Sequence, residues 1–163
     1  MAFGQSMGAS VVLATAASRP REVDGIALSN PYVFDTRLRL LPLGRRFVRN
    51  LPGVANDIAL PGQDENADDA MPVSAVAEMA AMMHVVRSTL PSLRKPVIVF
   101  RSGTDHVVPR SNAAKVLARI GSERAELIEC PDSYHVVTLD HDAPLVRARL
   151  LGFARELDAA RGA

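Results

Sequence analysis

The sequence has a single cysteine, almost no net charge and no long hydrophobic run. Because Cys130 is the sole cysteine, an internal disulfide is excluded, and the usage fits a reducing cytoplasm. The 19 basic and 18 acidic residues leave a formal charge of +1, so the basic footprint of a nucleic-acid-binding protein is missing. No apolar run approaches about eighteen residues and no export-type leader is present, so neither a membrane span nor secretion is expected.

The chain does contain enough apolar residues for one ordinary domain. It has 163 residues, of which 48% are hydrophobic and 23% charged, which suits a sizeable core. Helix-like and strand-like segments alternate, and this order predicts an α/β fold with a parallel sheet covered by helices on both faces. The predicted strands are Asp24–Asn30, Lys95–Phe100 and Ala125–Cys130, and the predicted helices are Met7–Ala17, a helix capped by Ser111 and closed by Gly121, and Ala143–Ala159 with Asp142 as N-cap.

The motif G-x-S-x-G occupies residues 4–8, at the very start of the chain. In this motif a strand turns sharply into a helix, and the serine at the apex takes a strained backbone conformation that exposes its Oγ. Glycine is expected at Gly4 and Gly8 because a side chain at either position would collide with the neighbouring strand or helix. Ser6 is therefore a candidate nucleophile, faced by the N-terminal dipole of the following helix.

A serine nucleophile needs a base to take its proton and an acid to orient that base. Asp105 follows the predicted strand Lys95–Phe100, and His135 follows the predicted strand Ala125–Cys130. Both lie in loops at the carboxyl ends of parallel strands, as Ser6 does, and functional groups gather at that edge of an α/β sheet. The chain order Ser, Asp, His is the one expected for such a triad.

Other histidines and aspartates compete for these roles. His106 is interpreted as a loop-packing residue, since its side chain would point away from a carboxylate aimed at His135. His84 fits a surface or cap position, and His141 fits a supporting one. Two further aspartates, Asp140 and Asp142, could pair with a histidine but follow His135 too closely to act from the preceding strand.

Residues 33–92 differ in character and are predicted to form a cap between the core segments 1–32 and 93–163. Arginines and leucines interleave over 37–49, an acidic loop follows, and then an apolar helix is predicted at Val73–Thr89. That helix carries methionines that are either core filler or adaptable contacts for an acyl chain, namely Met79, Met82 and Met83.

The segments around Ser6, Asp105 and His135 resemble those of bacterial α/β-hydrolases, most of all carboxylesterases and monoacylglycerol lipase-like enzymes. The similarity runs from Phe3 to about Leu157. It implies a triad of Ser6, Asp105 and His135, with the Met7 amide as half of the oxyanion hole. It also implies a small-molecule ester or acylglycerol substrate, and no metal or organic cofactor.

Family members have about eight strands, and the segments recognised here match the last three. The resemblance therefore implies an N-terminally truncated chain, without the loop that supplies the second oxyanion donor. Without the preceding strands of the family's sheet, the strand at 24–29 would have no partner on one side. This unpaired edge, with the apolar residues Ile26 and Leu28, would favour self-association. The alternatives are an inactive remnant, or a thioesterase, amidase or perhydrolase reaction on the same triad.

Overall fold

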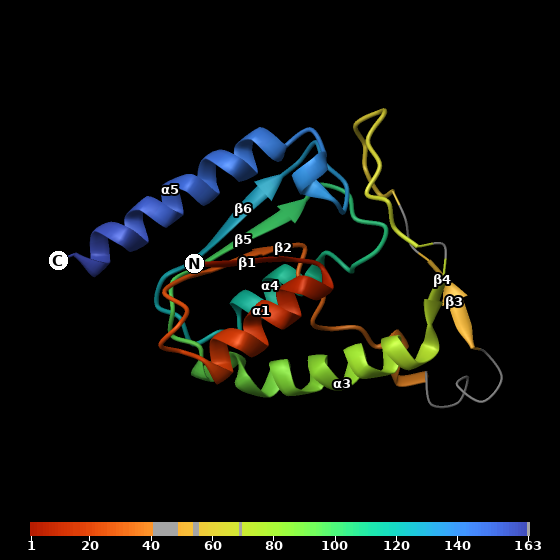
Figure 1. Cartoon of the computed structure of the whole chain (residues 1–163), viewed down its shortest axis with the longest axis horizontal. Coiled ribbons are helices and arrows are strands. Elements are labelled where there is room, and N and C mark those ends of the chain that lie inside the picture. The colour runs from red at the N-terminus through yellow and green to blue at the C-terminus, as the bar shows by residue number, and fades with distance from the viewer. Residues whose placement is uncertain (41–48, 54–55, 69, 163) are drawn as a thin grey trace.

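A parallel sheet lies at the centre of the fold. The computed structural model describes residues 1–40, 49–53, 56–68 and 70–162. In these residues the main sheet has the strand order β1-β2-β5-β6, and the bounds are Ala2–Gln5, Ile26–Ser29, Val97–Ser102 and Ala125–Cys130 (Figure 1). All neighbouring strands run parallel. Their carboxyl ends therefore meet at one edge, where α/β proteins place their functional groups.

The first residues form a fourth strand, which was not among the three predicted strands although the G-x-S-x-G motif implies a strand before Ser6. Ala2 pairs with Ile26 and Gln5 with Ser29, so β1 covers the side of β2 that we expected to be unpaired. The expectation that Ile26 and Leu28 form the exposed edge is therefore wrong. Three apolar or small residues before the motif gave no strand pattern, yet a parallel ladder needs only a few backbone groups. In the described residues the edge on this side is β1.

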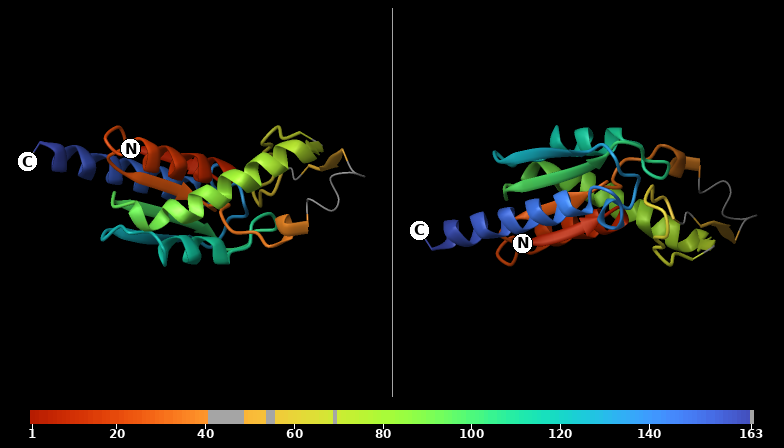
Figure 2. Two further views of the ribbon diagram at one scale, coloured as in Figure 1. Left: turned by 90° about the horizontal axis from the view of Figure 1, so that it is seen from below. Right: turned by 90° about the horizontal axis from the view of Figure 1, so that it is seen from above.

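Helices cover both faces of the sheet (Figures 1 and 2). One face carries α1 (Met7–Ser18), α3 (Val73–Thr89) and α4 (Ser111–Leu117), whereas α5 (Ala143–Arg161) covers the other. The fold class is therefore the predicted α/β arrangement.

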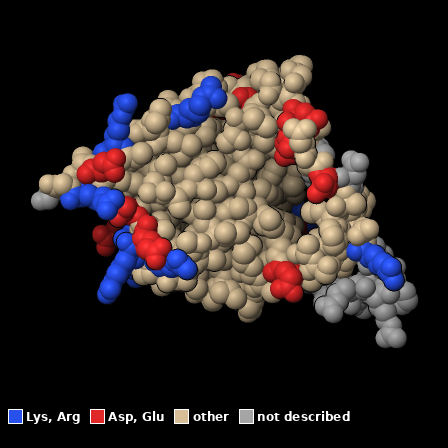
Figure 3. Space-filling view, viewed as in Figure 1, with Lys and Arg blue, Asp and Glu red and all other residues tan. Residues whose placement is uncertain are grey.

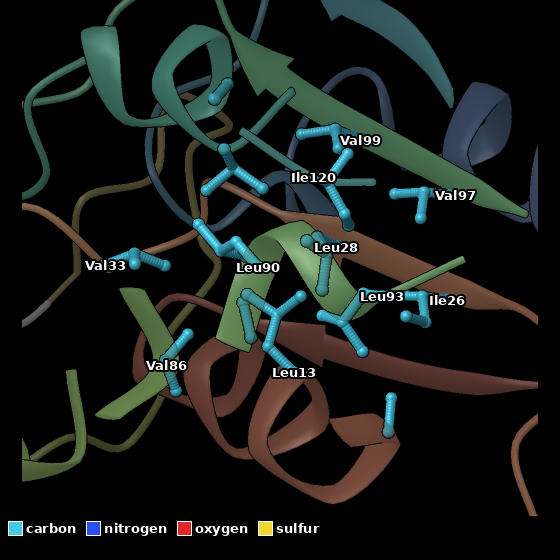
Figure 4. Packing of buried hydrophobic residues seen from close by; sticks show 14 of the residues in the cluster. Leu13, Ile26, Leu28, Val33, Val86, Leu90, Leu93, Val97, Val99 and Ile120 are labelled. Carbon is cyan, nitrogen blue, oxygen red and sulfur yellow. The ribbon is translucent and has the colours of Figure 1, made fainter. Parts of the chain in front are cut away.

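Alternating side chains along the strands supply two separate core clusters. Ile26 and Leu28 point to the face under α1 and α3, where they join Leu13 and Val86 (Figure 4). Ala27 points the other way, toward α5. Burial of one aliphatic side chain contributes about 1.5–3 kcal/mol to the free energy of folding. The two clusters therefore fix the strands, and with them the loops that follow, against the helices. The buried residues of the α5 cluster also include Ile98, Phe100, Val146, Phe153 and Leu157.

The insertion between β2 and β5 extends beyond the sheet. It contains the 3₁₀ helix η1 (Arg37–Leu40), the antiparallel pair β3 (Asn50–Pro52) and β4 (Ala70–Pro72), then α3 and the short η2 (Leu90–Ser92). β3 and β4 lie at the end of α3 that is far from the sheet (Figure 1). Much of the arginine and leucine stretch at 37–49 lies outside the described residues. Over the described ranges, no helix combines the length and apolarity that a membrane crossing requires.

Most predicted boundaries are confirmed, but two helix signals are wrong. β6 and α3 have the predicted bounds, and α1 and α5 run slightly further than predicted. Ser111 is the first residue of α4 rather than its cap. Gly121 does not close α4, which ends at Leu117; instead a Cβ there would lie 2.2 Å from the Pro91 carbonyl oxygen. Close packing therefore explains this glycine.

Candidate active site

Ser6 stands between β1 and α1 in a conformation rare for a residue with a side chain. Its φ is 53° and its ψ is −121°. Three backbone bonds hold it there: the Ser6 N–H donates to Ser29 O (2.9 Å), and the Ser6 carbonyl accepts from Tyr32 N (3.1 Å) and Ala9 N (3.1 Å). Strain of this kind persists only where the surroundings enforce it. The described bonds therefore supply the support that a strained elbow needs.

The two glycines of the motif behave differently. A Cβ on Gly4 would lie 2.3 Å from the carbonyl oxygen of Gly8, so the first turn of α1 can approach β1 only with glycine at position 4. A Cβ on Gly8 would meet nothing within 4 Å. The expected collision is thus confirmed at Gly4 and wrong at Gly8, because position 8 faces open space in the described structure.

The acid candidate Asp105 lies in the loop after β5, and its carboxylate is almost completely buried. One oxygen, Oδ1, accepts the backbone N–H groups of Val107 (2.9 Å) and Val108 (2.7 Å). The other, Oδ2, lies 2.9 Å from Nδ1 of His135. Because Oδ1 is fixed by its own loop, Oδ2 has a defined direction toward the imidazole.

The base candidate His135 lies in the loop after β6, with 7% of its side chain exposed. Thr138, in the 3₁₀ helix η3 (Val137–Leu139) of the same loop, donates to Oε1 of Gln5 at 3.1 Å. Gln5 directly precedes Ser6, so this bond ties the base loop to the elbow. The structure thus brings the three predicted segments to one edge of the sheet.

Asn30 is a buried residue of the site that the sequence did not point to. It follows β2, has a φ of 42°, and its amide donates to the His135 carbonyl at 2.8 Å. Its Oδ1 accepts from Ser102 N at 3.0 Å. Asn30 thereby joins the ends of β2 and β5 to the base loop. An asparagine between a strand and a proline was the only available signal, since asparagine tolerates positive φ.

Asp57 is the second residue that was missed. Its Oδ2 accepts from His106 N (3.0 Å) and His135 N (3.3 Å), and its Oδ1 lies 2.6 Å from Nδ1 of His106. The His106 ring also packs edge-on against Tyr134, with centroids 4.9 Å apart. His106 is therefore a packing residue as predicted, and it also pairs with a carboxylate from the insertion.

Asp140 binds main-chain groups rather than a histidine side chain. Burial by itself would raise its pKa, but N–H bonds from Ala59, Tyr134, His141 and Leu60 outweigh that effect and lower the pKa. The carboxylate therefore fastens the segment around 59–60 to the base loop.

Asp142 has a local structural role in the base loop. It occupies the N-cap position of α5, but its carboxylate accepts from Asp132 N (3.0 Å) and Ser133 Oγ (2.8 Å) instead of capping the helix. The described loop is thus held by two aspartates, neither of which replaces Asp105.

The remaining candidates lie on α1 and α3. Met7 is the first residue of α1, so its N–H has no intrahelical acceptor. Met83 is fully buried, Met82 packs against the core cluster, and Met79 is half-buried. His84 is exposed on α3, as expected for a surface histidine.

Comparison with known proteins shows the family to which the chain belongs. Residues 1–142 match the family model described as serine aminopeptidase, S33. The chain is 31% identical over 151 residues to a thermostable monoacylglycerol lipase of Bacillus sp. (strain H-257), covering 92% of this chain and 60% of that enzyme. The chain therefore spans less than two thirds of the length of this relative.

Solved structures give the same result. A structure from work on LipS and LipT, two metagenome-derived lipolytic enzymes, superposes with a TM-score of 0.87 at 33% identity, covering 94% of this chain and 64% of the other. The monoacylglycerol lipase of Paleococcus ferrophilus shares the fold, with a TM-score of 0.72 at 17% identity over 91% of this chain and 65% of the other. The chain belongs to the serine aminopeptidase S33 family of α/β-hydrolases.

Proposed function

We propose that this chain carries the catalytic triad of a serine hydrolase that cleaves carboxylic esters. The observation that supports this most directly is the 2.9 Å contact between Nδ1 of His135 and the carboxylate of Asp105, in a base loop that Thr138 bonds to Gln5, next in sequence to the elbow serine with a φ of 53°. A histidine oriented by a buried acid is the arrangement that activates a serine.

In the proposed reaction, Ser6 Oγ attacks the ester carbonyl while Nε2 of His135 takes its proton. Asp105 holds the imidazole in the tautomer with Nδ1 protonated, and the Met7 N–H donates to the oxyanion. The C–O bond to the alcohol then breaks, and His135 returns the proton to the leaving alcohol. Water, deprotonated by His135, attacks the acyl-Ser6 ester, and the acid leaves as Ser6 regains its proton.

The substrate class proposed is a small ester or monoacylglycerol. The two relatives named above as monoacylglycerol lipases suggest it, and the apolar helix α3 supplies suitable side chains. Of its methionines, Met79 is the best placed for contact with an acyl group, because it is not fully buried. Met82 and Met83 remain part of the same proposal, although they pack in the core of the described structure.

A panel of substrates tests the ester assignment. Nitrophenyl esters of increasing chain length, monoacylglycerols, a thioester and an anilide are given to the 163-residue chain and to the longest natural polypeptide that contains it. We expect ester cleavage to be fastest, with a fluorophosphonate probe blocking it by labelling Ser6. Faster thioester or anilide cleavage would move the reaction to another acyl transfer. Absence of turnover and of labelling in both polypeptides would contradict the proposal.

We further propose that the isolated chain turns over slowly, for want of a second oxyanion donor, and associates with itself. Apolar side chains are exposed at the N-terminus, on β1 and on α1: Met1 (45%), Phe3 (37%), Met7 (50%) and Val11 (47%). The region around β1 and α1 shows few charged side chains (Figures 1 and 3). An apolar edge strand favours pairing with another chain.

Light scattering tests self-association. We expect a mass above that of one chain, lowered toward the monomer by Phe3→Lys, since lysine on an edge strand opposes pairing. Leu151→Lys is the matched control, because Leu151 is 60% exposed but lies on the helix α5 rather than on the edge strand β1. A monomeric wild type, or equal effects of the two substitutions, would contradict association through this edge.

We also propose a cytoplasmic location for the protein. The proposal rests on the lone cysteine, Cys130, which is buried and free, as is usual in a reducing compartment.

A further inference from the structure

One carboxylate from the insertion contacts both loops that carry the candidate acid and base. Oδ2 of Asp57 accepts the backbone N–H of His106, which is adjacent to Asp105, and the backbone N–H of His135 itself. The carbonyl of Asp57 also accepts from Val136 N at 3.1 Å. Asp57 therefore touches the main chain on both sides of the Asp105–His135 pair.

The bonds from backbone N–H groups to Asp57 are largely shielded from water, whereas its contact with the His106 ring is not. The Asp57 side chain is only 11% exposed, whereas the His106 side chain is 59% exposed. The contact between the Asp57 carboxylate and the His106 ring is consequently open to solvent on its outer side and contributes little to stability. The bonds from backbone N–H groups to the largely buried carboxylate are charge-assisted, and bonds of this kind are about twice as strong as neutral ones.

The same segment is held a second time by Asp140. Its carboxylate accepts from Ala59 N (2.8 Å), Leu60 N (2.9 Å) and Tyr134 N (2.8 Å). Residues 57–60 are thus fixed to the base loop at two positions, and Asp57 is the one that also reaches the acid loop. Movement of the insertion at this point would change the spacing of the two loops.

We propose that Asp57 is a positioning residue that keeps the acid and base loops in register, so that Asp105 stays bonded to His135. It acts through main-chain groups and does not contact the reacting atoms. Its importance for turnover rests on the proposed ester hydrolase function, but its effect on the Asp105–His135 bond does not.

Asp57→Asn tests this role with little change in size. The asparagine amide keeps one acceptor oxygen but carries no negative charge, so the bonds from His106 N and His135 N lose their charge assistance and weaken. In NMR spectra we expect the downfield resonance of the His135 Nδ1–H proton in the wild type, and its loss or broadening in the variant. Where ester turnover is measurable, kcat should fall about 10–100-fold, with KM changed less than about threefold.

Two controls separate positioning from general damage. Asp64→Asn makes the same change in the same insertion, at an exposed residue whose carboxylate bonds locally to Asn66 N, and should leave the resonance and kcat unchanged. His106→Ala removes the screened ring contact but keeps the backbone N–H, and should also keep the resonance. Loss of the resonance in His106→Ala, or its persistence in a folded Asp57→Asn, would overturn the proposal.

Hydrogen exchange on the unmodified chain covers the case in which Asp57→Asn does not fold. The amides of His106 and His135 should exchange slowly, together with each other, because one carboxylate holds both. Exchange of both amides at the rate of an exposed loop would overturn the proposal. A wild type without ester turnover would contradict the proposed function alone, since the resonance and the exchange rates still report on Asp57.

Discussion

Replacing Ser6 with alanine should lower ester turnover by roughly 10⁶-fold in any active form of the protein, because loss of the nucleophile removes the acyl-enzyme route altogether. The substitution leaves the backbone bonds of the elbow in place, since Ser6 is held through its N–H and carbonyl groups. The fold should therefore survive, and binding of substrate, seen as KM or as inhibition by a product acid, should change little. Steady-state measurement of kcat with a nitrophenyl ester checks the size of the effect.

The matched control for this prediction is Ser18→Ala. Ser18 closes α1 on the surface, and its Oγ donates only to Thr15 O at 3.2 Å, so its loss should leave kcat within about twofold of the wild type. Equal rates for Ser6→Ala and the wild type would mean that another residue attacks the ester. Fluorophosphonate labelling of the Ser6→Ala variant would lead to the same conclusion.

The sequence was informative where function depends on local geometry. G-x-S-x-G defines a tight strand-to-helix turn through its own glycine, and Gly4 has the close approach to Gly8 that this requires. Asp105 and His135 could be placed because each directly follows an apolar strand, and the carboxyl ends of parallel strands share one edge. Strand pattern and chain order together were enough to predict which loops meet.

Long-range contacts to main-chain groups could not be predicted. Asp57, Asn30 and Asp140 each accept from or donate to backbone atoms of distant loops, and a backbone N–H has no signature in the sequence. The pairing of β1 with β2 was not predicted for a related reason, since it depends on backbone groups and on only a few residues. The residues that hold the triad are therefore less visible in a sequence than the residues that form it.

These supporting contacts join the loops at the carboxyl ends of the strands to one another. The elbow is held by Ser29 and Tyr32 and the base loop by Asn30, through bonds that cross from one strand end to another. Asp140 adds bonds from the base loop to residues 59–60 of the insertion. Because the acceptors and donors are mostly buried, water does not compete with them. The strand ends thus form a rigid frame, and the proposed chemistry needs only small movements within it.

Asp105→Asn should lower kcat about 10⁴-fold while KM stays close to the wild-type value, because an asparagine reverses the hydrogen bond to His135. Its Oδ1 can still accept from Val107 N and Val108 N, which keeps the acid loop in place and turns the amide N–H toward Nδ1 of the imidazole. Nδ1 must then be the acceptor and Nε2 carries the proton, so the ring no longer takes a proton from Ser6.

The control for this prediction is Asp132→Asn. Asp132 is an exposed aspartate of the base loop, so this variant should keep full activity. A double variant with Ser6→Ala should be no slower than Ser6→Ala alone, since the two residues act as one unit. A fall of less than tenfold for Asp105→Asn, in a variant whose unfolding is unchanged, would show that Asp105 does not orient the base.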